Sequence, residues 1–167
     1  GTGKALVFVG GWPFGGNMWE YQVDHFIKKG YRCITYDRRG FGRSDYPFTG
    51  YDYDVMSEDL HAIIAHLQLE KFVLIGFSMG GGEVVRYLTR YGSDAVERIV
   101  LIGSVTPYLL KKEDNEGFPI EGIEEMINGV LKDRPAFFES FNKSFFGETV
   151  SKAYLDVALQ RQMQSSL

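Results

Sequence analysis

The sequence predicts an α/β protein whose core is a mostly parallel, doubly wound sheet with helices on both faces. Short apolar runs, typical of strands that are buried on both sides, alternate along the chain with stretches in which apolar residues recur at helical spacing. This alternation favours parallel strands joined by helical crossovers. With 167 residues, 44% of them hydrophobic, the chain is long enough to bury one sizeable core and is a single domain on length alone.

The individual elements follow from where each pattern begins and ends. Strand-like runs occupy residues 5–9, 32–36, 72–76 and 98–103. Apolar residues share one face of three predicted helices: Trp19, Val23, Phe26 and Ile27; Leu60, Ile63, Ile64 and Leu67; Val84, Val85, Leu88 and Tyr91. The first helix should end at Gly30. The second should follow Ser57, with Glu58 and Asp59 near its positive end.

The strand pattern stops after the fourth run. We therefore expect residues 1–105 to form the α/β core and residues 106–167 to form a helical cap region, incomplete in this chain. Five phenylalanines make the densest aromatic cluster of the sequence: Phe137, Phe138, Phe141, Phe145 and Phe146. They have two interpretations, which are packing between helices and the lining of an apolar acyl pocket.

Between the third strand and the helix that follows it, the chain must reverse within the segment Gly76-Phe77-Ser78-Met79-Gly80. This is the G-x-S-x-G nucleophile-elbow pattern, in which a serine sits in a strained backbone conformation at a sharp corner. The flanking glycines leave no side chain against neighbouring backbone. The positive end of the helix points at the serine oxygen, so Ser78 is the candidate nucleophile for acyl transfer.

Composition and motifs exclude several classes of function. A net charge of -4 and a pI near 5.4 give no basic face for nucleic acid or an anionic membrane. The loop from Gly10 to Gly16 matches neither the dinucleotide fingerprint nor a P-loop. The one cysteine, Cys33, allows neither an internal disulfide nor a cysteine-rich metal site. No cofactor and no metal are expected, and a cytoplasmic location follows by default.

Several segments together resemble the bacterial arylesterases and cofactor-free haloperoxidases of the α/β-hydrolase superfamily: Gly11-Trp-Pro13, Met18-Trp-Glu-Tyr-Gln22, Tyr36-Asp-Arg-Arg-Gly-Phe-Gly-Arg-Ser-Asp45, Tyr51-Asp-Tyr-Asp54 and Gly76-Phe-Ser-Met-Gly-Gly-Gly82. The resemblance implies a carboxylesterase with Ser78 as nucleophile and an oxyanion hole from the backbone amides of Trp12 and Met79. It also implies a perhydrolase side activity, in which hydrogen peroxide replaces water. The family often has His-Gly before the tryptophan, where this chain has Gly10 and Gly11.

A catalytic base and acid are missing from the pattern. The three histidines, His25, His61 and His66, all fall on helices before the elbow, whereas this fold takes its acid and histidine after the serine. His61 and His66 also lie about 140° apart around a helix, so they make no one-face metal pair. Residues 103–105 after the fourth strand offer no acid.

The polar residues Asp37, Arg38, Arg39 and Asp45 are predicted to form an ion network within their own loop.

The apolar run at residues 99–102 would be an exposed sheet edge without a further strand. The chain is therefore expected to be the N-terminal portion of a hydrolase acting on small esters, with a complementary C-terminal polypeptide supplying acid and base. The oligomeric state stays open. Two alternatives remain, a non-catalytic ligand-binding or interaction protein on a hydrolase scaffold and, less well supported, a dinucleotide-binding oxidoreductase.

Overall fold

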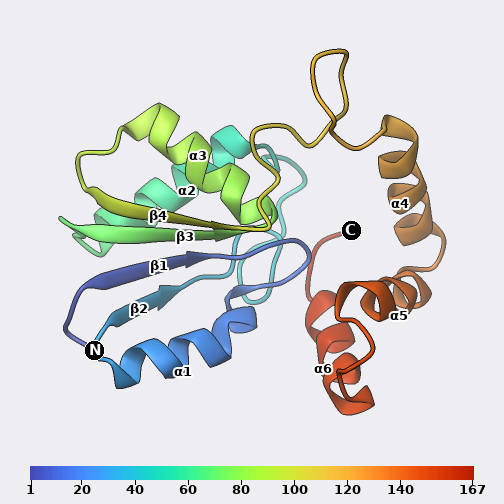
Figure 1. Cartoon of the computed structure of the whole chain (residues 1–167), viewed down its shortest axis with the longest axis horizontal. Helices are drawn as coiled ribbons and strands as arrows, with labels where there is room; N and C mark the ends of the chain where they lie inside the picture. Colours follow the sequence, from blue (N-terminus) through green and yellow to red (C-terminus); the bar gives the residue numbers. More distant parts are fainter. The chain divides into compact units, whose positions relative to one another are not determined.

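Four parallel strands form the sheet of the first of two units. The computed structural model describes residues 1–167 and divides into Gly1–Pro107 and Tyr108–Leu167, where the sequence predicts a boundary after residue 105. The strands are β1 (Ala5–Val9), β2 (Arg32–Thr35), β3 (Phe72–Phe77) and β4 (Val96–Ile102). Their order in the sheet is β2-β1-β3-β4, and every neighbouring pair is parallel (Figure 1). The predicted parallel α/β architecture is confirmed.

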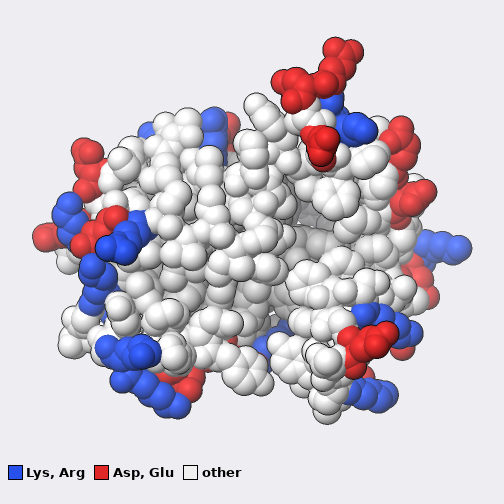
Figure 2. Space-filling view, viewed as in Figure 1, with Lys and Arg blue, Asp and Glu red and all other residues white.

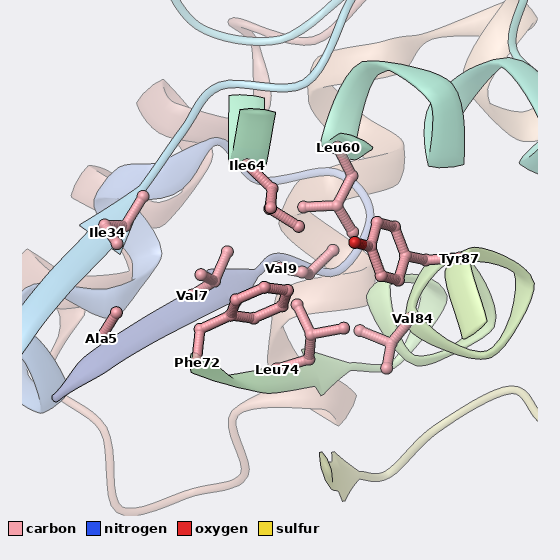
Figure 3. Close-up of a cluster of buried hydrophobic side chains, with 10 residues drawn as sticks. All are labelled: Ala5, Val7, Val9, Ile34, Leu60, Ile64, Phe72, Leu74, Val84 and Tyr87. Carbon is pink, nitrogen blue, oxygen red and sulfur yellow. The ribbon is translucent and has the colours of Figure 1, made fainter. Parts of the chain in front are cut away.

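Helices cover both faces of this sheet, which explains the unalternating apolar strands. One face packs against α2 (Tyr53–His66) and α3 (Met79–Tyr91), and Figure 3 shows side chains from these two helices meeting those of β1 and β3. The other face packs against the short helix η1 (Gly16–Trp19) and α1 (Glu20–Lys28). Side chains of β1 alternate between the two layers, with Val7 in the first cluster and Phe8 in the second.

Helix α2 begins earlier than the sequence analysis predicts. Its first residue is Tyr53, and the side chain of Asp52 caps it by accepting a hydrogen bond of 2.9 Å from the Val55 N–H. Ser57, expected to precede the helix, is buried inside it and donates its hydroxyl to the carbonyl of Asp54. The prediction was wrong because Asp52 and Ser57 both fit the capping position, and only the tertiary packing decides between them.

Strand β4 is an edge of the sheet with unusually apolar character. Its residues Ile99 and Ile102 are each 42% exposed, although their side chains are typical of a buried strand. An open edge of this composition is a template for pairing with a further strand. Elsewhere on the first unit, acidic and basic side chains are mixed on the face that Figure 2 shows.

The second unit contains α4 (Ile120–Lys132), α5 (Arg134–Phe145) and α6 (Lys152–Gln162). Phe137, Phe141 and Phe145 stack along α5 with centroid distances of 6.1 and 5.1 Å, and Phe146 meets Tyr154 of α6 edge to face. These ring contacts favour packing within the second unit as the role of the phenylalanines, and the lining of an acyl pocket stays a prediction. That this unit serves as a cap stays a prediction. None of the helices has the length and apolar character that a membrane span requires.

Candidate active site at the end of strand β3

Ser78 lies at a strained corner between β3, which ends at Phe77, and α3, which begins at Met79. Its backbone has φ 51° and ψ −119°, a conformation that residues with a side chain rarely adopt. The surrounding chain holds it there. The Ser78 N–H donates to the carbonyl of Ile102 at 3.0 Å, and the Ser78 carbonyl accepts from the Val105 N–H at 3.2 Å. The predicted strand, sharp turn and helix are thus present, with the serine at the corner.

The two glycines of the elbow are needed because backbone approaches them closely. A Cβ on Gly76 would lie 2.7 Å from the carbonyl oxygen of Gly80. A Cβ on Gly80 would lie 2.3 Å from the carbonyl oxygen of Val9 and 2.5 Å from that of Gly10. These distances are far below any normal contact with Cβ. The start of α3 therefore rests directly on the end of β1, as the spacing of the elbow implies.

The loop after β1 passes beside the candidate nucleophile. A Cβ on Gly11 would lie 3.1 Å from the Cβ of Ser78 and 2.8 Å from the Phe77 ring, so only glycine fits without displacement. Trp12 follows directly. Met79 is the first residue of α3, and its N–H has no acceptor within the helix. The structure thus brings Ser78, Met79 and the loop carrying Trp12 to one place, the carboxyl end of the parallel strands.

The histidines lie elsewhere in the first unit. His61 stacks on Tyr91, the last residue of α3, with ring centroids 3.9 Å apart. This is the opposite end of α3 from Ser78, roughly 18 Å away along the helix. A surface cavity of about 380 Å³ that His61 and Tyr91 line is at that end as well, so it does not include the elbow. His25 and His66 are exposed on α1 and at the end of α2.

An ionic network that the sequence did not predict joins α3 to the segment that follows β2. Glu83 of α3 is fully buried, and Arg38 is only 4% exposed. The Arg38 Nε–H donates to Glu83 Oε2 at 2.7 Å, the Tyr36 hydroxyl donates to Glu83 Oε1, and Arg38 Nη2 donates to the Gly10 carbonyl at 2.8 Å. Burial, together with the negative charge of Glu83, raises the pKa of Tyr36 well above its usual value. Burial alone would lower the pKa of Arg38, but Glu83 outweighs it and the net shift is upward.

The predicted ion network within the loop is therefore partly wrong. Arg38 pairs with Glu83, and Arg39 pairs with Asp59 of α2 through two hydrogen bonds of 2.6 and 2.7 Å. Asp37 instead accepts from the Gly16 N–H at 2.8 Å and lies 3.6 Å from the exposed Arg43 guanidinium. The sequence signal for the missed partner was a glutamate, Glu83, beside the apolar stripe of a helix.

Residues 103–105, directly after β4, include no acidic side chain. Ser104 occupies the region, with its hydroxyl 2.9 Å from that of Thr106 and its side chain packed against the α-carbon of Gly81. No three His, Cys, Asp or Glu side chains are grouped so that they could hold a metal ion.

A parallel sheet whose third strand runs through a strained serine into a helix, with a glycine loop beside that serine, defines the α/β class of proteins with a nucleophile elbow. Comparison with known families agrees. The sequence model described as "alpha/beta hydrolase fold" matches residues 4–159, so the chain belongs to the alpha/beta hydrolase family.

Three relatives are esterases or haloperoxidases by name. The structure of a bromoperoxidase from Bacillus anthracis superimposes with a TM-score of 0.96 at 46% identity over 99% of this chain and 63% of that one. Esterase EaEST from Exiguobacterium antarcticum gives a TM-score of 0.96 at 34% identity over 99% and 62%. A "bifunctional esterase/perhydrolase DCH" from Acinetobacter calcoaceticus is 38% identical over 80% of this chain and 50% of its own length. Non-heme haloperoxidases are also among the relatives.

The chain spans little more than half the length of the curated relatives that it matches. It covers 62% of the Bacillus subtilis protein YisY and 54% of the Kitasatospora aureofaciens non-heme chloroperoxidase. The similarity therefore concerns the part of those proteins that contains the sheet strands and the elbow described above.

Proposed function

We propose that this chain is the nucleophile-bearing part of a serine esterase that acts on small carboxylic esters. The observation that carries the proposal is Ser78 at a positive φ, with the backbone of Gly11 against it. In the reaction, Ser78 Oγ attacks the ester carbonyl carbon and loses its proton to a base. The bond to the alcohol then breaks, the alcohol leaves with a proton, and water hydrolyses the acyl-enzyme.

The negative charge that develops on the carbonyl oxygen needs donors at the elbow. Met79 N–H, at the positive end of α3, and the backbone N–H of Trp12 are the proposed oxyanion hole. Removing one such donor from an acyl-transfer enzyme typically slows kcat by about 10²–10³-fold. Both N–H groups belong to the backbone, and the glycines at positions 11 and 80 let that backbone pack closely, since a Cβ would lie 2.8 Å from the Phe77 ring at position 11 and 2.3 Å from the Val9 carbonyl oxygen at position 80.

The base and acid are proposed to come from polypeptide other than residues 1–167. The three histidines lie on α1 and α2, and His61 of α2 stacks on Tyr91, at the end of α3 that is far from Ser78. Strand β4 presents an apolar edge whose residues are 40–43% exposed between Ile99 and Ile102, which suits the addition of a further strand. A segment that paired parallel to β4 would end near the elbow, because the carboxyl ends of parallel strands share one edge of the sheet.

A perhydrolase side activity is part of the same proposal. Hydrogen peroxide would replace water in the second step, taking the acyl group from Ser78 to give a peracid and the free serine. The name of the Acinetobacter calcoaceticus relative, which combines esterase and perhydrolase, supports this. We also propose a cytoplasmic location, which fits the one free thiol, Cys33.

A chimera tests the proposal. Residues 1–167 are fused to the C-terminal segment of the Bacillus anthracis bromoperoxidase that extends beyond the matched region, and hydrolysis of p-nitrophenyl acetate is measured. The chimera should turn over and its Ser78→Ala variant should not, while residues 1–167 alone should show almost no turnover. Full activity of residues 1–167 alone would refute the external base. A folded but inactive chimera would favour the alternative, a ligand-binding protein on a hydrolase scaffold.

A further inference from the structure

The loop that passes beside Ser78 contains two consecutive glycines, Gly10 and Gly11, and is therefore intrinsically free to rotate. Inside the loop, the Phe14 N–H donates to the Gly11 carbonyl at 3.0 Å, which orients the peptide group that carries the Trp12 N–H relative to the rest of the loop. A preorganised donor also needs the loop itself to be fixed relative to Ser78. In this structure the carbonyl of Gly10 accepts a hydrogen bond of 2.8 Å from Arg38 Nη2. That bond fixes the peptide plane between Gly10 and Gly11, which directly precedes the plane that carries the Trp12 N–H.

Arg38 is itself held in one orientation. Its Nε–H donates to Glu83 Oε2 at 2.7 Å, its guanidinium carbon lies 5.5 Å from the centroid of the Phe41 ring, and its side chain is 3% exposed. Glu83 is fully buried and has both oxygens engaged, since the Tyr36 hydroxyl donates to Oε1. A planar guanidinium that is bonded to Glu83 and to the Gly10 carbonyl holds these two groups at a fixed relative position better than a flexible ammonium would.

Glu83 also connects this network to the elbow. It lies in α3, five residues after Ser78, and the first turn of that helix contacts the same loop, because a Cβ on Gly80 would lie 2.5 Å from the Gly10 carbonyl oxygen. The Gly10 carbonyl is thus located from two directions, by the helix that carries Met79 and by Arg38. The two proposed oxyanion donors, the N–H groups of Met79 and Trp12, are therefore held in a fixed position relative to each other.

Stability alone is a weak reason for such an arrangement. Burying an ion pair costs desolvation free energy that the attraction between the two charges barely offsets. Replacing a buried pair by apolar residues is therefore often neutral or stabilising. The neighbouring pair, Arg39 with Asp59, is joined by two hydrogen bonds of 2.6 and 2.7 Å but is partly exposed, and it connects the segment after β2 to α2. It provides a matched control that does not touch the Gly10 loop.

We propose that Arg38, held by Glu83 and Tyr36, is a positioning residue that fixes the Gly10 carbonyl and so aims the Trp12 N–H at the oxyanion formed on Ser78. The catalytic part rests on the proposed esterase function. The positioning part concerns the backbone of residues 10–15 and holds for the chain with or without turnover.

The first test uses the chimera. Arg38→Met combined with Glu83→Gln removes both buried charges, which keeps the variant foldable. We expect kcat for p-nitrophenyl acetate to fall about 100-fold with KM changed less than about 2-fold, and the affinity for phenylboronic acid, whose tetrahedral adduct mimics the oxyanion, to fall in parallel. Arg38→Lys should restore part of kcat. Arg39→Lys should leave kcat within about 2-fold of wild type.

The second test needs no catalysis. Amide hydrogen exchange of the 167-residue chain is followed by mass spectrometry in peptides covering residues 10–15. Exchange there should be at least about 10-fold faster in the double variant and unchanged in Arg39→Lys, with equal thermal midpoints. Unchanged exchange, or a fall in kcat matched by a fall in phenylboronate affinity in the Arg39→Lys control, would overturn the inference. If the wild-type chimera shows no turnover, the proposed function fails, and hydrogen exchange alone decides the positioning role.

Discussion

Replacing Gly80 by alanine should destabilise the first unit, although alanine is the better helix former. The added Cβ would lie 2.3 Å from the Val9 carbonyl oxygen, while ordinary contact begins near 3.4 Å, so α3 must move about 1 Å from β1. Overpacking against main chain costs up to about 3 kcal/mol, and the gain from alanine in a helix is about 1 kcal/mol. The net loss in unfolding free energy is therefore up to about 2 kcal/mol, which corresponds to roughly 8–16 °C in Tm for a unit of about 100 residues.

Tryptophan fluorescence during urea unfolding measures this loss selectively, because the two tryptophans, Trp12 and Trp19, both belong to the first unit. The control is Gly122→Ala on α4 of the second unit, where a Cβ would meet nothing within 4 Å. It should leave the tryptophan transition unchanged and stabilise α4 by about 0.5–1 kcal/mol in the far-UV signal. A Gly80→Ala variant as stable as wild type would show that α3 does not rest on the end of β1.

Three further predictions concern the loop after β1, the phenol of Tyr36 and a pair of amide side chains in the second unit. Gly11→Ala should lower kcat of the chimera at least about 10-fold through a displacement near the nucleophile, whereas Gly10→Ala, whose nearest obstacle is a flexible methionine sulfur at 3.1 Å, should stay within about 2-fold. The raised pKa of Tyr36 means that the unfolded chain loses this proton first, so stability is fully present below about pH 10 and falls above it by about 1.4 kcal/mol per pH unit; Tyr36→Phe should flatten that slope in urea titrations. Gln162→Leu leaves the buried Asn142 amide unpaired and should cost about 2–3 kcal/mol by circular dichroism, and the further change Asn142→Leu should recover part of it; equal stability of the single and double variants would contradict this.

The sequence predicts the sheet and elbow well because both depend on local patterns. The strand at Phe72–Phe77 and the glycines around Ser78 are each recognisable within a few residues, and the structure confirms the elbow conformation. The parallel arrangement also follows, since only strands covered on both faces are continuously apolar. The chemistry of the backbone donors is implied by the same motif.

Long-range pairing could not be predicted in the same way. Arg38 has charged neighbours in its own loop, and nothing local indicates that its partner is Glu83, 45 residues later. The start of α2 at Tyr53 depends on a choice between two capping residues that the local sequence leaves equal. In both cases the decision belongs to burial, which requires the fold itself.

The identity of the nucleophile is the central claim, and covalent labelling tests it most directly. A fluorophosphonate is incubated with the chimera, and the modified residue is located by peptide mass spectrometry. The phosphonyl adduct should be found on Ser78, at the corner between β3 and α3, and should be absent from Ser78→Ala. An adduct on another residue, or no adduct on a folded chimera, would contradict the claim that this elbow carries the reactive serine.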